Sequence, residues 1–505
     1  MDVIATLPEE MLREILSLLP FNDLLHCTLV CWHWHNIAEP MIHRRGYIRI
    51  GVDMTGHGRT LWNSTRQYHT VVVDNPPGSR RSLVNLLMLP STWIFKPSEI
   101  QLLNFLADSL DKFCRHGHRL LENAETVHIK LDDDRHMYLN DGAEEFVLKF
   151  PMMKHLVWSE SLHGHGWKTV TIDAPLLQTV VVSDALDPTA VLKIPECDQL
   201  QHVKCSFRTK TFENVFTGYL SRLETLILDF HHHDYDLYMV RGMPCLKWLE
   251  LSVELELPHS IIETILGCSK LEGLKLEVRN CHAPHGRINL NQVFDKLSEL
   301  QQIELSGLSL SGCNPIEAQE LRLLKMRNVK LPKADCELSF NAPTLHTLST
   351  CEESLVKMNI DIGNRMKKLY VELKDTNWKE AFNVYLRPFL HLHVSIDELI
   401  LMFPYSNNLI TCDKSLFDQP ALEVVRLELH HFEIRCDFTE NVNNWHSLQR
   451  LSLVNCNVIC CCPTTTSECG IFNSRNLPAI VIKTMRNHRK RREWTSLGRN
   501  HINPL

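Results

Sequence analysis

The sequence of 505 residues has little net charge and lacks the long apolar run that a membrane-spanning helix needs. Lys and Arg total 53 against 60 Asp and Glu, a formal net charge of −7, so we expect no general attraction to nucleic acid or to a membrane surface. No stretch approaches the length of uncharged apolar chain that spans a bilayer. The opening MDVIATLPEE has no charged segment followed by an apolar core, so we expect no secretory signal and a cytoplasmic or nuclear location, or both.

Motifs for catalysis and for cofactor binding are also missing. There is no Gly-rich phosphate loop and no G-x-S-x-G elbow, and no Cys or Ser stands near a base in a recognisable motif. We therefore expect no catalytic site and no cofactor. Without a secretory signal, the 18 cysteines are expected to be reduced thiols that pack as small apolar residues.

The sequence has two groups of possible metal ligands and one strongly basic segment. The His and Asp residues in 231–236 are too close along an extended loop to converge on one ion, which favours a solvated loop. The cysteines of 456–469, with His488 downstream, lack paired C-x-x-C spacing, so no metal is expected, and only Cys456 has a clear role as a repeat turn residue. The six cations in 483–492 fit either a nuclear import signal or a solvated tail.

The first forty residues are predicted to fold as three short amphipathic helices. The first has apolar residues at helical spacing: Leu7, Met11, Leu12, Ile15, Leu16 and Leu19. Residues 6–9 match a capping box with Pro8 in the first turn, and Pro20 is expected to end this helix. Asn22 is expected to cap a second helix, and the third is expected to run from Cys31 to Glu39 and to end at Pro40.

A segment of this size buries too little surface to hide its many large apolar side chains. It is therefore either a docking module that a partner completes or a helical cap on a larger domain. Its residues resemble the F-box motif in order and spacing: Leu7-Pro8, Ile15-Leu16, Leu19-Pro20, Asp23-Leu24, and Val30-Cys31 followed by Trp34.

The resemblance implies binding to a Skp-family adaptor and, through it, to a cullin–RING ubiquitin ligase. The residues expected to contact the adaptor are Leu7, Pro8, Ile15, Leu16, Leu24, Val30 and Trp34.

The rest of the chain repeats the pattern apolar-x-x-apolar-x-apolar about every 25 residues. Tyr68 begins an early copy, and fourteen further copies begin at Ala124, Met153, Leu177, Leu200, Leu223, Leu246, Leu271, Leu300, Leu321, Leu345, Met366, Ile396, Leu422 and Leu448. Each copy predicts a short strand, and segments such as 260–267 and 97–113 predict helices between strands. This layout resembles a leucine-rich-repeat solenoid, although the Asn or Cys of that consensus is found only at Cys456.

The predicted fold is therefore α/β, a three-helix F-box followed by an irregular leucine-rich-repeat solenoid with parallel strands on its concave face and helices or loops outside. We expect an F-box over 1–45, irregular first coils over 46–122, the solenoid over 123–460, and a Cys-containing segment with a basic tail over 461–505. An open doubly wound sheet would need longer apolar strands and a phosphate loop.

The resemblance places the residue between the last two apolar positions of each repeat on the concave face, where a target would bind. This column, which includes Arg426, carries no single sign of charge, and its centre alternates as Glu250, Lys275, Glu304 and Lys325, which should pair locally. Exposed apolar residues there suggest a protein contact, unless loops cover them. The candidate target-binding residues are Val157, Val181, Ile227, Trp248, Glu250, Lys275 and Tyr370.

The sequence thus predicts a substrate-recognition subunit of a Skp–cullin–F-box ubiquitin ligase that is not itself an enzyme and binds an unidentified protein. Two alternatives stay open: a scaffold that uses the F-box without degradation, and a plain leucine-rich-repeat binding module. We expect no nucleic-acid or membrane partner.

Overall fold

The computed structural model forms two compact units, 1–251 and 252–505, which are described separately. It describes residues 7–50, 68–75, 96–105, 110, 113–114, 121–131, 145–159, 169–186, 191–194, 197–207, 221–230, 240, 243–254, 257–279, 287–311, 315–331, 338–351, 354–355, 358–363, 365–373, 395–403, 410–412, 423–435, 447–459 and 480–485. The loop 231–236 and most of the segment after 459 therefore lie outside the described residues.

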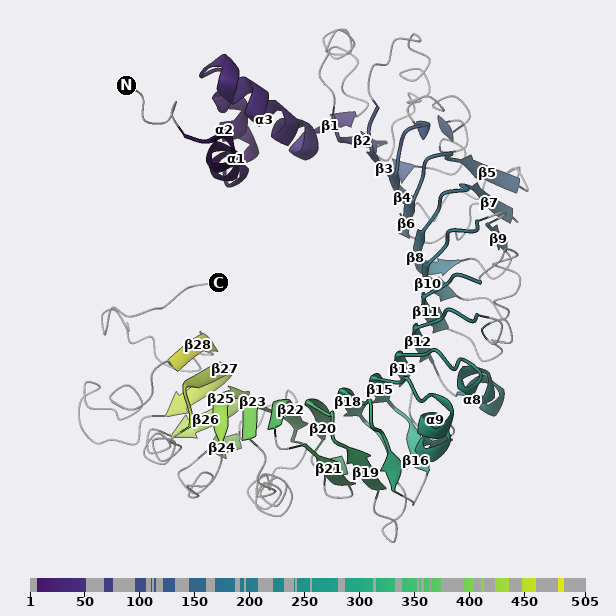
Figure 1. Ribbon diagram of the computed structural model, residues 1–505, viewed down its shortest axis with the longest axis vertical. Helices are drawn as coiled ribbons and strands as arrows, with labels where there is room; N and C mark the ends of the chain where they lie inside the picture. The colour runs from purple at the N-terminus through teal and green to yellow at the C-terminus, as the bar shows by residue number, and fades with distance from the viewer. Residues whose placement is uncertain are drawn as a thin grey trace, which may run out of the picture. The chain divides into compact units, whose positions relative to one another are not determined.

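The first unit opens with three helices, α1 (Glu9–Ser17), α2 (Phe21–Cys27) and α3 (Trp32–Arg45), as predicted (Figure 1). They enclose a small apolar core in which Leu12, Leu16, Leu24, Cys27, Ile37, Ala38 and Ile42 are buried. Leu12 and Leu16 stand one helical turn apart, so one stripe of α1 supplies its whole contribution to this core.

The predicted helix ends are partly wrong. Pro8 is the N-cap of α1 and not part of its first turn, no side chain caps that helix, and Thr6 lies outside the described residues. The second helix begins at Phe21 after Pro20, so Asn22 lies inside it and is not its cap. The third helix does not end at Pro40 but continues to Arg45. Pro40 and Asn36 are both exposed, so water can bond the Asn36 carbonyl that a proline four residues later leaves without an amide partner.

Gly46 joins the last helix directly to the first strand, β1 (Tyr47–Ile50). Its N–H donates to the Ile42 carbonyl at 2.6 Å, and its own carbonyl accepts from Thr70 N–H at 3.4 Å. A Cβ atom at this position would lie 2.6 Å from the Ile42 oxygen, closer than a carbon can approach. Only glycine fits this junction without moving the backbone.

A ladder of parallel strands follows in the first unit, and Figure 1 shows its members side by side. Neighbouring strands pair in the order β1, β2 (Thr70–Asp74), β3 (Glu99–Phe105), β4 (Thr126–Leu131), β6 (His155–Ser159), β8 (Thr179–Leu186), β10 (His202–Phe207) and β11 (Thr225–Phe230). The next strand, β12 (Trp248–Val253), begins with Trp248 N–H bonded to the Glu224 carbonyl at 2.9 Å. Behind these strands runs a second parallel ladder of β5 (Glu145–Lys149), β7 (Thr169–Asp173) and β9 (Val191–Lys193).

The helix predicted over 97–113 is wrong for its first part, because 99–105 forms strand β3. Ile100 and Leu102 are fully buried and take the second and third positions of a repeat that the pattern search missed. Among the described residues of 46–122, β1, β2 and β3 pair in parallel in that order.

The second unit contains a ladder of the same kind. Its main strands pair in the order β13 (Gly273–Val278), β15 (Gln302–Ser306), β18 (Leu323–Arg327), β20 (Thr347–Cys351), β22 (Arg365–Glu372), β23 (Ser395–Met402), β25 (Val424–His430), β27 (Arg450–Ile459) and β28 (Ile480–Met485). Because β28 pairs with β27, the ladder continues past residue 460, where the solenoid was expected to end.

Among the described residues of this unit, short strands and the helices α8 (His259–Leu266) and α9 (Leu290–Lys296) form the layer behind these main strands. The first of these helices is close to the predicted 260–267. The rear strands pair as β14 (Arg287–Asn289) with β16 (Ser309–Ser311), as β17 (Ile316–Glu317) with β19 (Leu338–Ala342) and β21 (Met358–Ile362), and as β24 (Ile410–Cys412) with β26 (Phe432–Arg435). Sequence analysis had expected helices or loops there and did not foresee these rear ladders.

The repeat pattern correctly located the core, because the second and third apolar positions of nearly every repeat are buried between the two layers. One repeat was placed two residues too early. In β25, Leu427 pairs with Leu399 and Leu429 with Leu401, so the buried residues are Val424, Leu427 and Leu429. Arg426 was predicted to stand between the last two apolar positions of this repeat. That position is instead occupied by Glu428, which pairs with Ile400.

A left-handed backbone residue follows β15, β18 and β25 directly and lies within β3 and β27. Two residues after the third apolar position, the backbone is left-handed at Asn104, Gly307, Asn328, His431 and Asn455. Asparagine and glycine tolerate this conformation best. The turn of each of these coils is therefore marked one position before the consensus Asn. Cys456 does occupy the consensus position, where its buried thiol donates to the Leu429 carbonyl at 3.2 Å.

We predict that Gly46→Ala lowers the free energy of unfolding of the first unit by about 1–3 kcal/mol, because the added methyl group meets a backbone oxygen. Chemical denaturation measures the change. Arg44→Ala, an exposed neighbour in α3, should change it by less than about 0.5 kcal/mol. Equal stability of the glycine and alanine forms would show that the junction is looser than described.

We also predict that iodoacetamide at about pH 8 labels the exposed Cys31 and spares Cys456. Burial raises the pKa of the Cys456 thiol to about 11, so only ~1 in 1,000 of these thiols is ionised at that pH, and the reagent cannot reach it. Peptide mass spectrometry reads out both sites, with the chain unfolded in urea as the control in which both are labelled. Equal labelling in the folded chain would contradict the packing of this turn.

Candidate functional site

The three-helix segment leaves a set of large apolar side chains uncovered, and we call this set the apolar F-box surface: Met11, Ile15, Leu18, Leu29, Val30 and Trp32. Met11 and Ile15 on α1 and its C-cap residue Leu18 have the spacing of one helical face, which lies beside the stripe of Leu12 and Leu16 that packs in the core. Leu18 is 84% exposed, which is unusual for a leucine that no partner covers.

The second half of this surface lies between α2 and α3. Leu29 is 82% exposed and is followed by the exposed Val30, in the turn that leads into α3. Trp32 opens α3, is 75% exposed, and stacks on His35 with 5.2 Å between ring centroids. A segment this small cannot bury both faces of its helices, and the face left over is apolar.

The seven residues expected to contact an adaptor divide by burial. Pro8, Ile15 and Val30 are exposed, Leu7 and Trp34 are half-buried, and Leu16 and Leu24 are completely buried in the helical core. Leu16 and Leu24 therefore hold the three helices together, and their side chains present no surface. The motif did not identify Met11, Leu18, Leu29 and Trp32 as exposed candidates for adaptor contact. The helical spacing of Met11, Ile15 and Leu18 could have identified the first two.

The Arg45 side chain connects α3 to the C-terminal end of α1. Its guanidinium donates to the Leu19 carbonyl at 2.9 Å and to the Ser17 carbonyl, both at the C-terminal end of α1. Helix ends leave such carbonyls without partners, and a cation is favourable there because of the helix dipole. The same residue ends α3 next to Gly46, so one side chain ties the first helix to the junction with the strands.

In the first unit, the candidate target-binding residues lie on the face of the main ladder away from the core. Val157 and Val181 are register partners on β6 and β8, and Ile227 pairs with Lys204, which separates it from the two valines. All three are half-buried, as are Trp248 and Glu250 on β12. The apolar row expected from sequence is therefore interrupted by a lysine.

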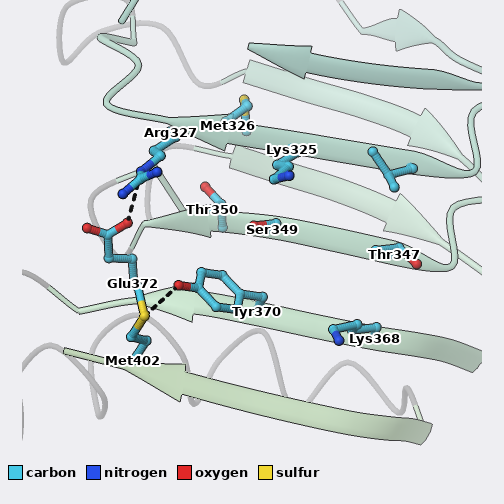
Figure 2. A pocket seen from close by; sticks show the side chains of 11 residues that line it. Lys325, Met326, Arg327, Thr347, Ser349, Thr350, Lys368, Tyr370, Glu372 and Met402 are labelled. Carbon is cyan, nitrogen blue, oxygen red and sulfur yellow. Dashed lines mark hydrogen bonds and ion pairs between the residues drawn. The ribbon is translucent and has the colours of Figure 1, made fainter. Parts of the chain in front are cut away.

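In the second unit, Lys275 pairs in register with Glu304, and Lys325 on the next strand binds Glu304 at 3.1 Å. The local pairing expected from the alternating charges is thus present at this position. Tyr370 borders a hollow of about 360 Å³ on the solvent face of β18, β20, β22 and β23 (Figure 2). We call it the β20 hollow; its lining is formed by Leu323, Lys325, Met326, Arg327, Thr347, Ser349, Thr350, Lys368, Tyr370, Glu372 and Met402.

The described residues contain no group of three or more His, Cys, Asp or Glu side chains that could hold a metal ion. The possible ligands in 231–236 and 460–469, and His488, lie outside those residues. No helix within the described residues has the length and the apolar character needed to cross a membrane.

Comparison with known families matches residues 4–49 to the F-box-like family. No curated relative matches the chain. Among solved structures, TLR13 in complex with ssRNA13 is similar at 16% identity and a TM-score of 0.41; the similarity covers 82% of this chain, which spans only 60% of that one.

Two further structures have lower scores. An internalin (inlF) from Listeria monocytogenes has 11% identity and a TM-score of 0.28, over 67% of this chain and 86% of the other. The plant peptide hormone receptor RGFR1 bound to RGF2 has 12% identity and a TM-score of 0.25, over 78% and 74%. The solenoid assignment rests on the strand ladders themselves. Residues 4–49 thus match the F-box-like family, and the parallel-strand ladders that follow in each unit are those of a solenoid.

Proposed function

We propose that this chain is the substrate-recognition subunit of a Skp–cullin–F-box ubiquitin ligase. The single observation that carries the proposal is the apolar F-box surface, which lies in the segment that matches the F-box-like family. Covering one exposed leucine or isoleucine side chain contributes roughly 1.5–3 kcal/mol. A helical adaptor that covered several of these side chains would gain several times this amount, which is set against the entropic cost of association.

The proposed mechanism is positional, and we propose no catalysis by this chain. The F-box would attach the chain to the adaptor while the solvent face of the solenoid holds a target protein. The rate of ubiquitin transfer would rise because target lysines are kept near the ubiquitin carrier, which raises their effective concentration. The Gly46 junction and the Arg45 bonds support this idea, since a floppy connection would dilute that effect. Such a ligase subunit would work in the cytoplasm or the nucleus.

The test uses the full chain and a purified Skp-family adaptor. Ile15→Asp combined with Val30→Asp should weaken adaptor binding by at least ~100-fold, because two charges would have to be buried in an apolar contact. Both side chains are exposed, so the fold should be unaffected. Calorimetry or a pull-down with known adaptor concentrations measures the loss.

The matched control is Val147→Asp, an exposed apolar residue on the rear strand β5, which should leave adaptor affinity unchanged. Unchanged binding by the double variant would contradict the proposal. If the adaptor binds but depletion of this chain does not raise the level of any bound protein, the scaffold alternative would replace the ligase role.

A further inference from the structure

The β20 hollow exists because β20 presents short side chains between the long ones of its neighbours. Ser349 pairs in register with Lys325 of β18 on one side and with Tyr370 of β22 on the other. Two residues further along β20, Cys351 is buried, and its thiol lies 3.3 Å from the Ser354 hydroxyl instead of filling the solvent face. The floor of the hollow is therefore low at β20, between longer side chains on β18 and β22 (Figure 2).

Each of the three cations that border the hollow is paired with a carboxylate. Lys325 and Lys368 bind glutamates of the neighbouring strands β15 and β23, with N–O distances of 3.1 Å and 2.9 Å. Arg327 reaches across β20 to Glu372 of β22, at 3.9 Å (Figure 2). The rim consequently carries no net charge, and a charged ligand would have to compete with ion pairs that already exist.

Between these ion pairs, the lining combines apolar surface with neutral hydroxyl groups. Leu323 and Met402 are half-buried and border the hollow together with the ring of Tyr370. The Tyr370 hydroxyl donates at 2.9 Å to the sulfur of Met402, which is a weak acceptor. A carbonyl oxygen brought in by a ligand would be a stronger acceptor for the same hydroxyl.

A hydrogen-bond acceptor accompanies this donor, because the Tyr370 hydroxyl and the Glu372 carboxylate lie at the same end of the hollow (Figure 2). Burial, and after it the charge of Glu372, raises the pKa of Tyr370, so its hydroxyl keeps the proton and remains a donor at neutral pH. The side chain of Glu372 is only 14% exposed, and its distance of 3.9 Å from Arg327 is longer than a hydrogen bond. Its carboxylate can therefore still accept an N–H group.

We propose that the β20 hollow binds the side-chain amide of a glutamine or asparagine residue in the target protein. The inference rests on the proposed function, because it takes the solvent face of the solenoid to hold a target. An amide side chain is uncharged, its carbonyl can accept from Tyr370, and its NH₂ group can donate to Glu372. The volume of about 360 Å³ lies at the small end of the range for ligand sites, which suits a single side chain.

Side chains of similar size but different chemistry fit the hollow less well. Glutamate has the shape of glutamine, but it would place a second carboxylate beside Glu372 and has no N–H to donate. Methionine would fill the same space, but it offers Tyr370 only another thioether. A lysine or a phosphorylated residue would bring an unpaired charge to a rim whose charges are already paired.

The test measures binding of the full chain to peptide arrays with degenerate flanking residues around one fixed glutamine, asparagine, methionine, glutamate, lysine or phosphoserine. The better of the two amide arrays should bind at least ~10-fold more strongly than the glutamate, lysine and phosphoserine arrays, because those arrays place an unpaired charge in the hollow. It should bind at least ~3-fold more strongly than the methionine array, which is the effect of about one hydrogen bond.

Two variants separate the shape of the hollow from its hydrogen bonding. Ser349→Leu fills the floor and should weaken binding of the amide arrays at least ~10-fold. Tyr370→Phe removes the donor and should bring the amide and methionine arrays within about twofold of each other, while the amide arrays still exceed the glutamate array.

The matched controls make the same chemical changes outside the lining. Gln302→Leu adds an apolar side chain at an exposed position of β15, and Tyr47→Phe removes an exposed hydroxyl from β1. Both should keep all the ratios within about twofold.

Equal binding of the amide and glutamate arrays, stronger binding of the phosphoserine array, or an amide preference that survives both Ser349→Leu and Tyr370→Phe would overturn this inference. Adaptor binding by the same preparation tests the proposed function separately, because neither hollow variant alters the F-box. Retained adaptor binding without an amide preference would contradict the amide site alone.

Discussion

In-register pairing of parallel strands is the constraint on which this structure depends. Each coil must present its backbone to the next at the same height, so equivalent residues of successive coils stack in columns. One set of columns is buried and apolar, and the alternate set faces solvent. Short side chains in the solvent columns, as at Ser349, create hollows, and long charged ones pair across strands. The ladder thus converts the repeat of the sequence into an extended surface for recognition.

The three N-terminal helices follow a different logic, because they are too few to cover themselves. Leu16 and Leu24 are buried where the helices pack together, while Leu18, Leu29 and Trp32 are exposed to solvent. In a segment of this size, such exposed apolar side chains are better explained by docking to a partner than by stabilisation of the fold. The tight junction at Gly46 means that whatever binds this surface is held at a defined place relative to the first strands.

Sequence reasoning located the helices and most strands because both depend on the periodicity of apolar residues. It failed where one local pattern permits two structures. The short apolar run in 97–113 fits a helix or a strand, and only pairing with neighbouring coils selects β3. Around Leu427, two overlapping frames satisfy the repeat, and register with Leu399 decides between them. The β20 hollow could not be foreseen, because it depends on which side chains three separate coils bring together.

We propose that a Skp-family adaptor covers the apolar F-box surface. Hydrogen–deuterium exchange of the full chain, alone and with the purified adaptor, tests it most directly. We expect slower exchange in peptides covering 11–18 and 29–32 when the adaptor is present, with little change in β4, β6 and β8 (Thr126–Leu131, His155–Ser159 and Thr179–Leu186). Unchanged exchange in both helical segments at saturating adaptor, or slowing confined to the strands, would contradict the account.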